Sequence, residues 1–186
     1  MSTRPLSRAH SFLPRGLGPT LSVLAAAALV ACGGGGGGDT TPPAASVTVA
    51  GVVADGPLGG ATVCYDLNDN TACDSSEPSA VSDANGHYTF AIDAAVAGKH
   101  AVIASVPATA VDKDTGRPVG TAITLKSPAT GANGAQNVFV SPLTTLVVDV
   151  AVAQGLSRAD ATAAVQGQLG LTASPLTNFV ASTDSQ

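Results

Sequence analysis

The sequence has no tryptophan, and aromatic residues make up only 3 % of its 186 positions. Without Trp, a flat aromatic platform for stacking sugars is disfavoured. Charged residues are scarce as well, at 11 % of the chain, against roughly 25 % in typical globular proteins. The formal net charge is −5 and no basic stripe is present, which argues against a nucleic-acid partner. Hydrophobic residues nevertheless make up 45 % of the chain and are spread along it, which argues against disorder throughout.

Several sequence motifs of enzymes are also missing. There is no Gly-x-Ser-x-Gly nucleophile elbow, and the glycine run 33–38 lacks the Lys and Ser/Thr of a phosphate-binding loop. His87 and His100 have no Cys or His partner at the spacing of a zinc site, so we expect both at the surface. These residues therefore single out no catalytic site.

The N-terminal apolar run spans residues 21–31, which is shorter than the ~20 residues that cross a bilayer. Arg4, Arg8 and Arg15 precede it, which is the charge pattern of a secretory signal. The run ends in Leu29-Val30-Ala31-Cys32, which resembles the lipobox of bacterial lipoproteins. In that family the Cys thiol becomes the diacylglyceryl attachment point. The alternative is a soluble signal peptide in which Cys32 has no role.

The lipobox resemblance implies that residues 1–31 are a lipoprotein signal peptide and that Cys32 is lipidated. Incorporation of palmitate into the chain would then report the lipid anchor. The membrane is then a partner through this N-terminal lipid. Gly33 resembles the default outer-membrane sorting signal of Gram-negative cells, so the expected location is the bacterial cell envelope, at the outer membrane. Cleavage leaves 155 residues with a net charge of −8, because three of the eight basic side chains and none of the thirteen acidic ones are removed.

Residues 32–46 are expected to form a disordered Gly/Thr/Pro tether after the lipidated cysteine. Its random-coil reach is about 20 Å. Lipidation of Cys32 leaves Cys64 and Cys73, an even pair in an oxidising compartment, which predicts a disulfide between them. Closing this short loop would stabilise the fold by roughly 3 kcal/mol in the chain-entropy model.

Residues 47–140 carry the pattern of a β-domain. Alternating β-branched and aromatic residues, separated by Gly, Asp and Pro turn signals, predict about six or seven short strands. This spacing favours an antiparallel, immunoglobulin-like β-sandwich. The segments expected to form strands are 47–53, 61–65, 88–92, 99–106, 122–125 and 137–140, with a polar loop at 66–82 and turns at 83–86 and 112–116.

Residues 141–180 are expected to form a helical hairpin, followed by a tail at 181–186. Ser141 and Ser157 are the expected N-caps, and Gly155 and Gly170 the expected helix ends. Since such a pair of helices cannot bury both apolar faces alone, it must pack on the sandwich or on further chain. We also expect the sequence to be the front end of a larger lipoprotein, or a fragment. The apolar stripes are Leu143, Leu146, Val147 and Val150 in the first helix and Ala161, Ala164, Val165 and Leu169 in the second.

The segment 66–77 places oxygen-bearing side chains at positions 1, 3, 5, 9 and 12 of a twelve-residue loop, with a carbonyl at position 7. These are the ligand positions of a calcium-binding loop. Thr71 departs from the pattern at position 6, where glycine is usual, and the flanks are not two helices. The predicted Ca²⁺ ligands are Asp66, Asn68, Asn70, the carbonyl of Ala72, Asp74 and Glu77.

The charge pattern supports a cation at this loop. No Lys or Arg lies between Arg15 and Lys99, so the loop carboxylates have no basic partner nearby in the sequence and repel one another. The alternative is a solvated acidic loop whose Asn and Asp residues merely favour turns. Asp112, Asp114 and Gly116 form a second partial motif that is better explained as a β-turn.

Two segments carry a resemblance to known families. Residues 51–63 contain a Gly-x-Val strand and a Gly-Ala-x-Val strand, and residues 82–90 read Ser-Asp-Ala-Asn-Gly-His-Tyr-Thr-Phe. Together they resemble the carboxypeptidase-regulatory-like and adhesin B-repeat families, which are transthyretin-like β-sandwiches, over residues 47–92. The acidic loop resembles an insert in such modules at the front of bacterial surface lipoproteins, where a segment like 140–147 commonly follows.

This resemblance implies a non-catalytic stalk, spacer or adhesion module with no enzyme activity. We therefore expect a lipid-anchored envelope protein that presents or spaces an unidentified envelope or extracellular partner. One alternative is a peptide- or glycan-binding module. The other is an accessory N-terminal part of a larger surface hydrolase.

Overall fold

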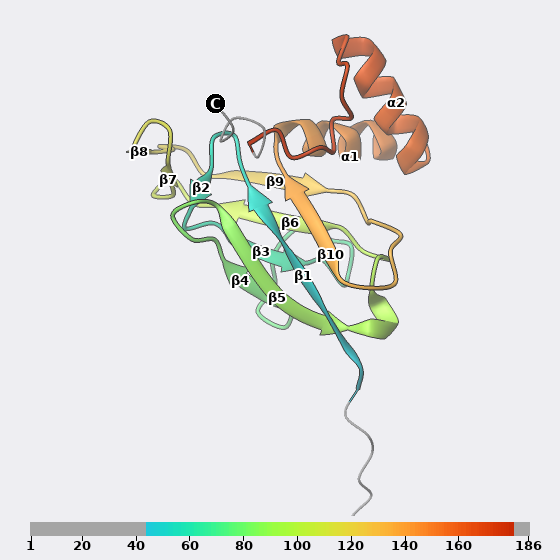
Figure 1. Ribbon diagram of the computed structural model, residues 1–186, viewed down its shortest axis with the longest axis horizontal. Coiled ribbons are helices and arrows are strands. Elements are labelled where there is room, and N and C mark those ends of the chain that lie inside the picture. Colours follow the sequence, from blue (N-terminus) through green and yellow to red (C-terminus); the bar gives the residue numbers. More distant parts are fainter. Residues whose placement is uncertain (1–43, 181–186) are drawn as a thin grey trace, which may run out of the picture. The chain divides into compact units, whose positions relative to one another are not determined.

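The computed structural model describes residues 44–180, which are mainly β-structure followed by two helices (Figure 1). The predicted signal peptide 1–31, Cys32, the tether up to residue 43 and the tail 181–186 lie outside the described residues. The elements are β1 (Ser46–Val53), β2 (Leu58–Gly59), β3 (Thr62–Tyr65), β4 (Ser79–Val81), β5 (His87–Asp93), the 3-10 turn η1 (Ala94–Val96), β6 (Val102–Val106), β7 (Val111–Asp112), β8 (Arg117–Pro118), β9 (Ile123–Ser127), β10 (Gln136–Val140), α1 (Pro142–Gln154) and α2 (Arg158–Leu169).

The strands form two main sheets, with the orders β10-β1-β5 and β4-β3-β6-β9, and a small sheet β2-β7-β8. The pairing of β1 with β10 is parallel, while the other strand pairs are antiparallel. The expectation of a wholly antiparallel fold is therefore wrong at this pair. Parallel neighbours need a long crossover connection, and the whole β-domain between β1 and β10 supplies it.

Each predicted strand is present with shifted ends. β6 begins at Val102 rather than at Lys99, because the Lys99 N–H is bonded to Val96 O in the turn that follows η1. Four further strands, β2, β4, β7 and β8, were not predicted from the sequence, and they have only two or three residues each. Strands of this length are too short to show an alternating pattern.

One hydrophobic cluster joins the two main sheets. Val49 and Val53 from one sheet and Val63, Tyr65 and Val102 from the other belong to it, each at most 1 % exposed. This arrangement is consistent with the predicted β-sandwich, because each sheet contributes alternate side chains to a shared interior.

Gly51 lies where β1 passes between its two neighbours. A Cβ atom there would lie 1.8 Å from Val138 O of β10, so no larger residue fits without moving the strands. The Tyr88 hydroxyl of β5 donates to the same carbonyl at 2.7 Å. Burial raises the pKa of Tyr88, so its hydroxyl keeps the proton for this bond. The close approach of β10 to β1 therefore explains why the Gly-x-Val pattern has a glycine at position 51.

The predicted turn 83–86 connects β4 to β5 and is closed by Asp83. Its Oδ1 accepts from the N–H groups of His87 (2.9 Å) and Asn85 (2.8 Å), and these bonds lower the pKa of Asp83. Gly86 has a φ of 74°, and a Cβ there would lie 2.4 Å from Val53 O. The Asp-x-Asn-Gly signal therefore fixes how the chain passes from one sheet to the other.

Helix α1 is attached to β9 through hydroxyl groups at its first turn. Thr144 Oγ1 donates to Lys126 O at 2.7 Å and accepts from the Ser141 N–H at 2.8 Å. Thr145 Oγ1 accepts from the Lys126 N–H at 2.8 Å, and Lys126 Nζ forms an ion pair with Asp149. Both backbone polar groups of Lys126 are thus satisfied by the helix.

The two helices share a small apolar core made of Val147, Ala161 and Val165. Leu169, expected in the apolar stripe of the second helix, is 48 % exposed, because α2 ends there and Gly170 turns the chain away with a φ of 63°. No helix within residues 44–180 is long and apolar enough to span a bilayer.

We expect the substitution Thr144→Val to lower the free energy of unfolding by about 1–3 kcal/mol, because it leaves the buried Ser141 N–H without a partner and removes the shorter of the two hydroxyl hydrogen bonds to Lys126 O. Urea unfolding followed by circular dichroism measures this loss. The control Thr162→Val removes only a hydroxyl on α2 that donates to Arg158 O at an exposed position, and we expect a change within about 0.5 kcal/mol. Equal effects of the two substitutions would contradict this role of Thr144.

Candidate metal-binding loop

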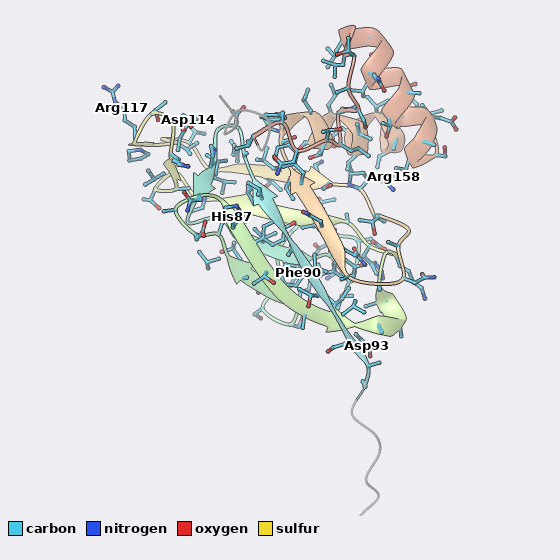
Figure 2. All side chains as sticks on the ribbon, in the orientation of Figure 1. His87, Phe90, Asp93, Asp114, Arg117 and Arg158 are labelled. Carbon is cyan, nitrogen blue, oxygen red and sulfur yellow. A yellow bond between two sulfur atoms is a disulfide. The ribbon has the colours of Figure 1, made fainter. Side chains whose placement is uncertain are left out.

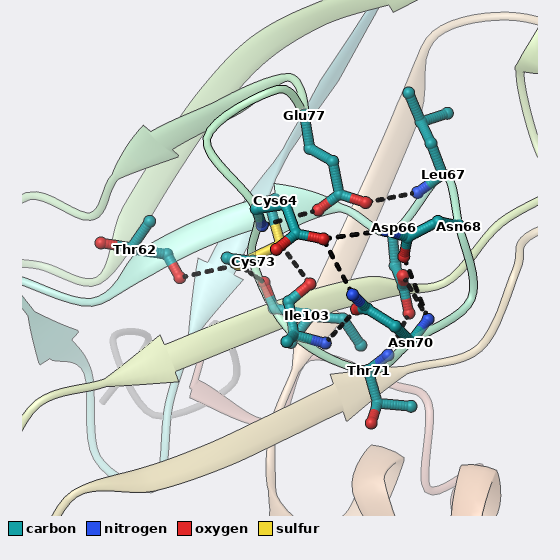
Figure 3. Close-up of a disulfide and its surroundings, with 12 residues drawn as sticks. Thr62, Cys64, Asp66, Leu67, Asn68, Asn70, Thr71, Cys73, Glu77 and Ile103 are labelled. Atoms are coloured by element: carbon teal, nitrogen blue, oxygen red, sulfur yellow. Dashed lines mark hydrogen bonds between the residues drawn. A yellow bond between two sulfur atoms is a disulfide. The ribbon is translucent and has the colours of Figure 1, made fainter.

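The acidic segment 66–77 connects β3 to β4 and returns close to where it leaves the sheet. The Tyr65 N–H donates to Pro78 O at 3.0 Å. Cys64 and Cys73 form a disulfide with a Cα–Cα distance of 5.5 Å, which confirms the predicted pairing (Figure 3). The middle of the loop is thereby fixed to β3, and only short stretches of chain remain free on either side of Cys73.

Two buried carboxylates hold the ends of the loop together. Asp66 is 1 % exposed and accepts from the N–H groups of Asn70 (3.0 Å) and Thr71 (2.9 Å). Glu77 is 7 % exposed and accepts from the N–H groups of Leu67 (2.8 Å) and Asp74 (3.1 Å). Each buried carboxylate therefore has both of its oxygens hydrogen-bonded to a peptide N–H of the loop.

Three of the predicted ligands meet at one atom. The side-chain amides of Asn68 and Asn70 each donate to Asp74 Oδ2 at 2.8 Å (Figure 3). Their carbonyl oxygens accept from the backbone, Asn68 Oδ1 from Asn70 N–H (3.2 Å) and Asn70 Oδ1 from Ala72 N–H (2.8 Å). Positions 3, 5 and 9 of the calcium-loop pattern thus lie together, as the spacing predicts.

The backbone of the loop is strained at two positions. Asp69 and Thr71 have φ values of 57° and 61°, and they are the only residues other than glycine with a positive φ in the described part of the chain. Thr71 occupies position 6, where the pattern favours glycine, and it adopts the left-handed conformation that a glycine would adopt. A β-branched residue in this conformation costs about 1–3 kcal/mol.

His100 joins the loop to the start of β6, a contact the sequence analysis missed. Its Nδ1 lies 3.1 Å from Asp69 Oδ1, and its side chain is only 20 % exposed. The imidazole packs edge-on against the Tyr65 ring, with the centroids 5.7 Å apart. No local signal could reveal this contact, because His100 and Asp69 are 31 residues apart in the sequence.

The predicted ligand set is assembled only in part. The Ala72 carbonyl oxygen lies 3.8 Å from Cys64 Sγ, a disulfide sulfur with no hydrogen to donate. Within residues 44–180, no group of three or more His, Cys, Asp or Glu side chains is placed to hold a metal ion. Any cation here would depend on the amide oxygens of Asn68 and Asn70 in addition to carboxylates. Hard oxygens of this mixed kind suit Ca²⁺ rather than a transition metal.

The second partial motif forms a tight turn, as expected, but it spans five residues rather than the four of a β-turn, because the Gly116 N–H donates to Asp112 O at 2.8 Å. Asp112 Oδ1 accepts from the N–H groups of Asp114 (2.8 Å) and Thr115 (3.2 Å), and the segment joins the paired strands β7 and β8. These hydrogen bonds account for the acidic residue at the start of the turn, Asp112.

Comparison with known proteins gives no family. No protein-family model and no curated protein matches the chain. Among solved structures, the crystal structure of the major plantain pollen allergen Pla l 1 aligns with 52 % of this chain and 90 % of its own, at 15 % sequence identity and a TM-score of 0.28. A likeness at this level carries no conclusion about fold or function.

We expect the double substitution Cys64→Ser/Cys73→Ser to lower the free energy of unfolding by about 3 kcal/mol, because the crosslink limits the unfolded chain. Denaturant unfolding of the full chain, with and without a reducing agent, measures the loss. Reductant should destabilise the unsubstituted chain and leave the double variant unchanged. The control Cys32→Ser should leave the unfolding curve unchanged, since Cys32 is not part of this bond. A loss below about 0.5 kcal/mol in the double variant would contradict a stabilising crosslink.

Proposed function

We propose that the chain is a non-catalytic spacer or adhesion module of the bacterial envelope, anchored through a lipid on Cys32 and stabilised by calcium at the loop 66–77. The observation that carries this proposal is the disulfide that fixes an acidic loop to the sheet. Such crosslinks form and persist outside the reducing cytosol. The resemblance of residues 47–92 to carboxypeptidase-regulatory-like and adhesin B-repeat modules supports the same role.

The geometry of the loop supports calcium as the stabilising ion. The NH₂ groups of Asn68 and Asn70 both donate to Asp74 Oδ2. A cation bound to Asp74 Oδ2 would displace these two NH₂ groups. In the proposed bound state the Oδ1 atoms of both asparagines bind the ion together with Asp74. Asp66 and Glu77 complete the set with carboxylate oxygens whose remaining lone pairs are not used by the backbone N–H bonds. The Ala72 carbonyl, whose oxygen lies 3.8 Å from Cys64 Sγ, would have to turn toward the ion to bind it. Bound Ca²⁺ would supply the positive charge that the segment lacks.

We expect millimolar Ca²⁺ to raise the melting temperature of the full chain by about 5–10 °C, because an ion that binds only the folded state stabilises it by mass action. Asp74→Asn should abolish this rise, since it removes the charge on which both amides converge while keeping the side-chain shape. Thermal unfolding with Ca²⁺, with Mg²⁺ and with a chelator measures the effect. Asp112→Asn in the β7–β8 turn is the matched control and should keep the full rise. An unchanged melting temperature in Ca²⁺ would refute the ion site.

We expect cells that express the full chain to incorporate radioactive palmitate into it, and Cys32→Ser to abolish the label. The reason is that a diacylglyceryl thioether and the acyl chain that follows both depend on this thiol. Membrane fractionation provides the second readout, because the variant should leave the membrane fraction. Persistent label in Cys32→Ser would exclude this residue as the anchor, while Cys64→Ser/Cys73→Ser should retain the label.

A further inference from the structure

The edges of the two main sheets differ in how they are covered. At one side β9 and β10 meet through the bridge between Lys126 and Ser141, and α1 satisfies the backbone of Lys126. At the other side β4 is an edge of only three residues. β5, with seven residues, is the long edge that remains in the described part of the chain. Long uncovered edges are templates for a further strand.

The hydrogen bonds to β1 show which β5 groups face outward. Val53 N–H donates to Gly86 O and Ala94 N–H donates to Ala45 O, so the even-numbered residues of β5 face β1. The N–H and C=O groups of Thr89 and Ala91 therefore point away from the sheet. Neither has a partner within residues 44–180, and both residues are exposed. They form a donor and acceptor pattern that an extended chain would complete.

The surroundings of this edge leave it open. An open hollow of about 600 Å³ extends from the face of the sheet, at Ala50 of β1, past Thr89 of β5 to Val81 of β4. Val81 is 65 % exposed. β5 carries no Pro or Lys, the residues by which natural edges usually prevent further pairing. Figure 2 shows His87, Phe90 and Asp93 spaced along this strand.

We propose that β5 pairs antiparallel with β5 of a second copy of this chain, in the register that places Thr89 opposite Ala91 of the other copy. Each of the two Thr89–Ala91 pairs then exchanges two backbone hydrogen bonds. The strand ends beyond these pairs place His87 opposite Asp93 of the other copy. The His87 imidazole, whose Nδ1 lies 3.6 Å from Asp83 Oδ2, then meets a second carboxylate, and Asp93 uses only its Oδ1 to accept the Ala95 N–H. Registers shifted by two residues lose both His87–Asp93 pairs.

The aromatic residue at the centre of the strand favours the same register. Phe90 is only partly buried against the core, with its ring stacked on Tyr88 at a centroid distance of 5.9 Å. In the proposed register Phe90 faces its own twin across the two-fold axis, at a non-hydrogen-bonded position where cross-strand side chains approach most closely. Pairing therefore covers the remaining exposed part of this ring. The contact uses the same patch on both copies, as two-fold symmetry requires.

Cysteine crosslinking of the full chain tests both the pairing and its register. All variants carry Cys32→Ser, so that Cys64 and Cys73, already paired, are the only other cysteines. Thr89→Cys and Ala91→Cys proteins are purified separately and oxidised alone or as an equal mixture. We expect a crosslinked dimer in the mixture at least tenfold more abundant than in either protein alone. The opposed positions lie about 5.5 Å apart between Cα atoms, a distance that a disulfide spans.

A crosslink that forms as readily in Thr89→Cys alone or Ala91→Cys alone would overturn the register. The absence of crosslinking in the mixture would overturn the pairing. The control pair Thr48→Cys and Ala50→Cys lies on the central strand β1 of the same sheet and should give no dimer above the background of single variants. As a second measurement, Thr89→Pro should shift sedimentation of the Cys32→Ser chain toward monomer. Thr89→Pro removes the backbone N–H that points away from β1 and no hydrogen bond to β1. The melting curve of the variant shows whether it keeps the fold.

Discussion

The acidic loop depends on two carboxylates that are buried and bonded to the peptide backbone. Asp66 and Glu77 stand at the two ends of the loop, and each accepts two N–H donors from residues inside it. A buried carboxylate is costly unless its oxygens are satisfied, so the loop must keep the shape that supplies those donors. The disulfide between Cys64 and Cys73 restricts the same segment covalently. Together these constraints place Asn68, Asn70 and Asp74 side by side.

The sheet gives this loop a rigid base. β3, which precedes the loop, lies between β4 and β6, and its Val63 and Tyr65 side chains are fully buried in the shared core. The Tyr65 hydroxyl donates to Val96 O and accepts from the Lys99 N–H, so the segment before β6 is fixed beside the loop. His100 then reaches Asp69. The order of the loop is thus a property of the whole domain, and strain at Thr71 is tolerated because its surroundings determine its conformation.

The sequence was sufficient where the signal is local. Residue types at short spacing predict three features that the structure confirms. They are the turn 83–86, the helix caps at Ser141 and Gly155, and the disulfide between Cys64 and Cys73. Contacts between distant segments left no such signal. The parallel pairing of β1 with β10 and the His100–Asp69 contact depend on which segments meet in three dimensions. The convergence of the amides on Asp74 was predictable from spacing, whereas the direction of the Ala72 carbonyl was not.

Calcium binding by the loop 66–77 is the part of the proposed function on which its stabilisation depends. Calorimetric titration of the full chain with Ca²⁺, in a buffer previously treated with chelator, tests it most directly. If the loop binds Ca²⁺ as proposed, we expect saturable binding of one ion per chain, with a dissociation constant in the range of about 10⁻⁶–10⁻³ M. We also expect Asp74→Asn to abolish this binding. No saturable heat up to millimolar Ca²⁺, or equal binding by the Asp74→Asn chain, would contradict the account and leave the loop as a solvated turn held by its own hydrogen bonds.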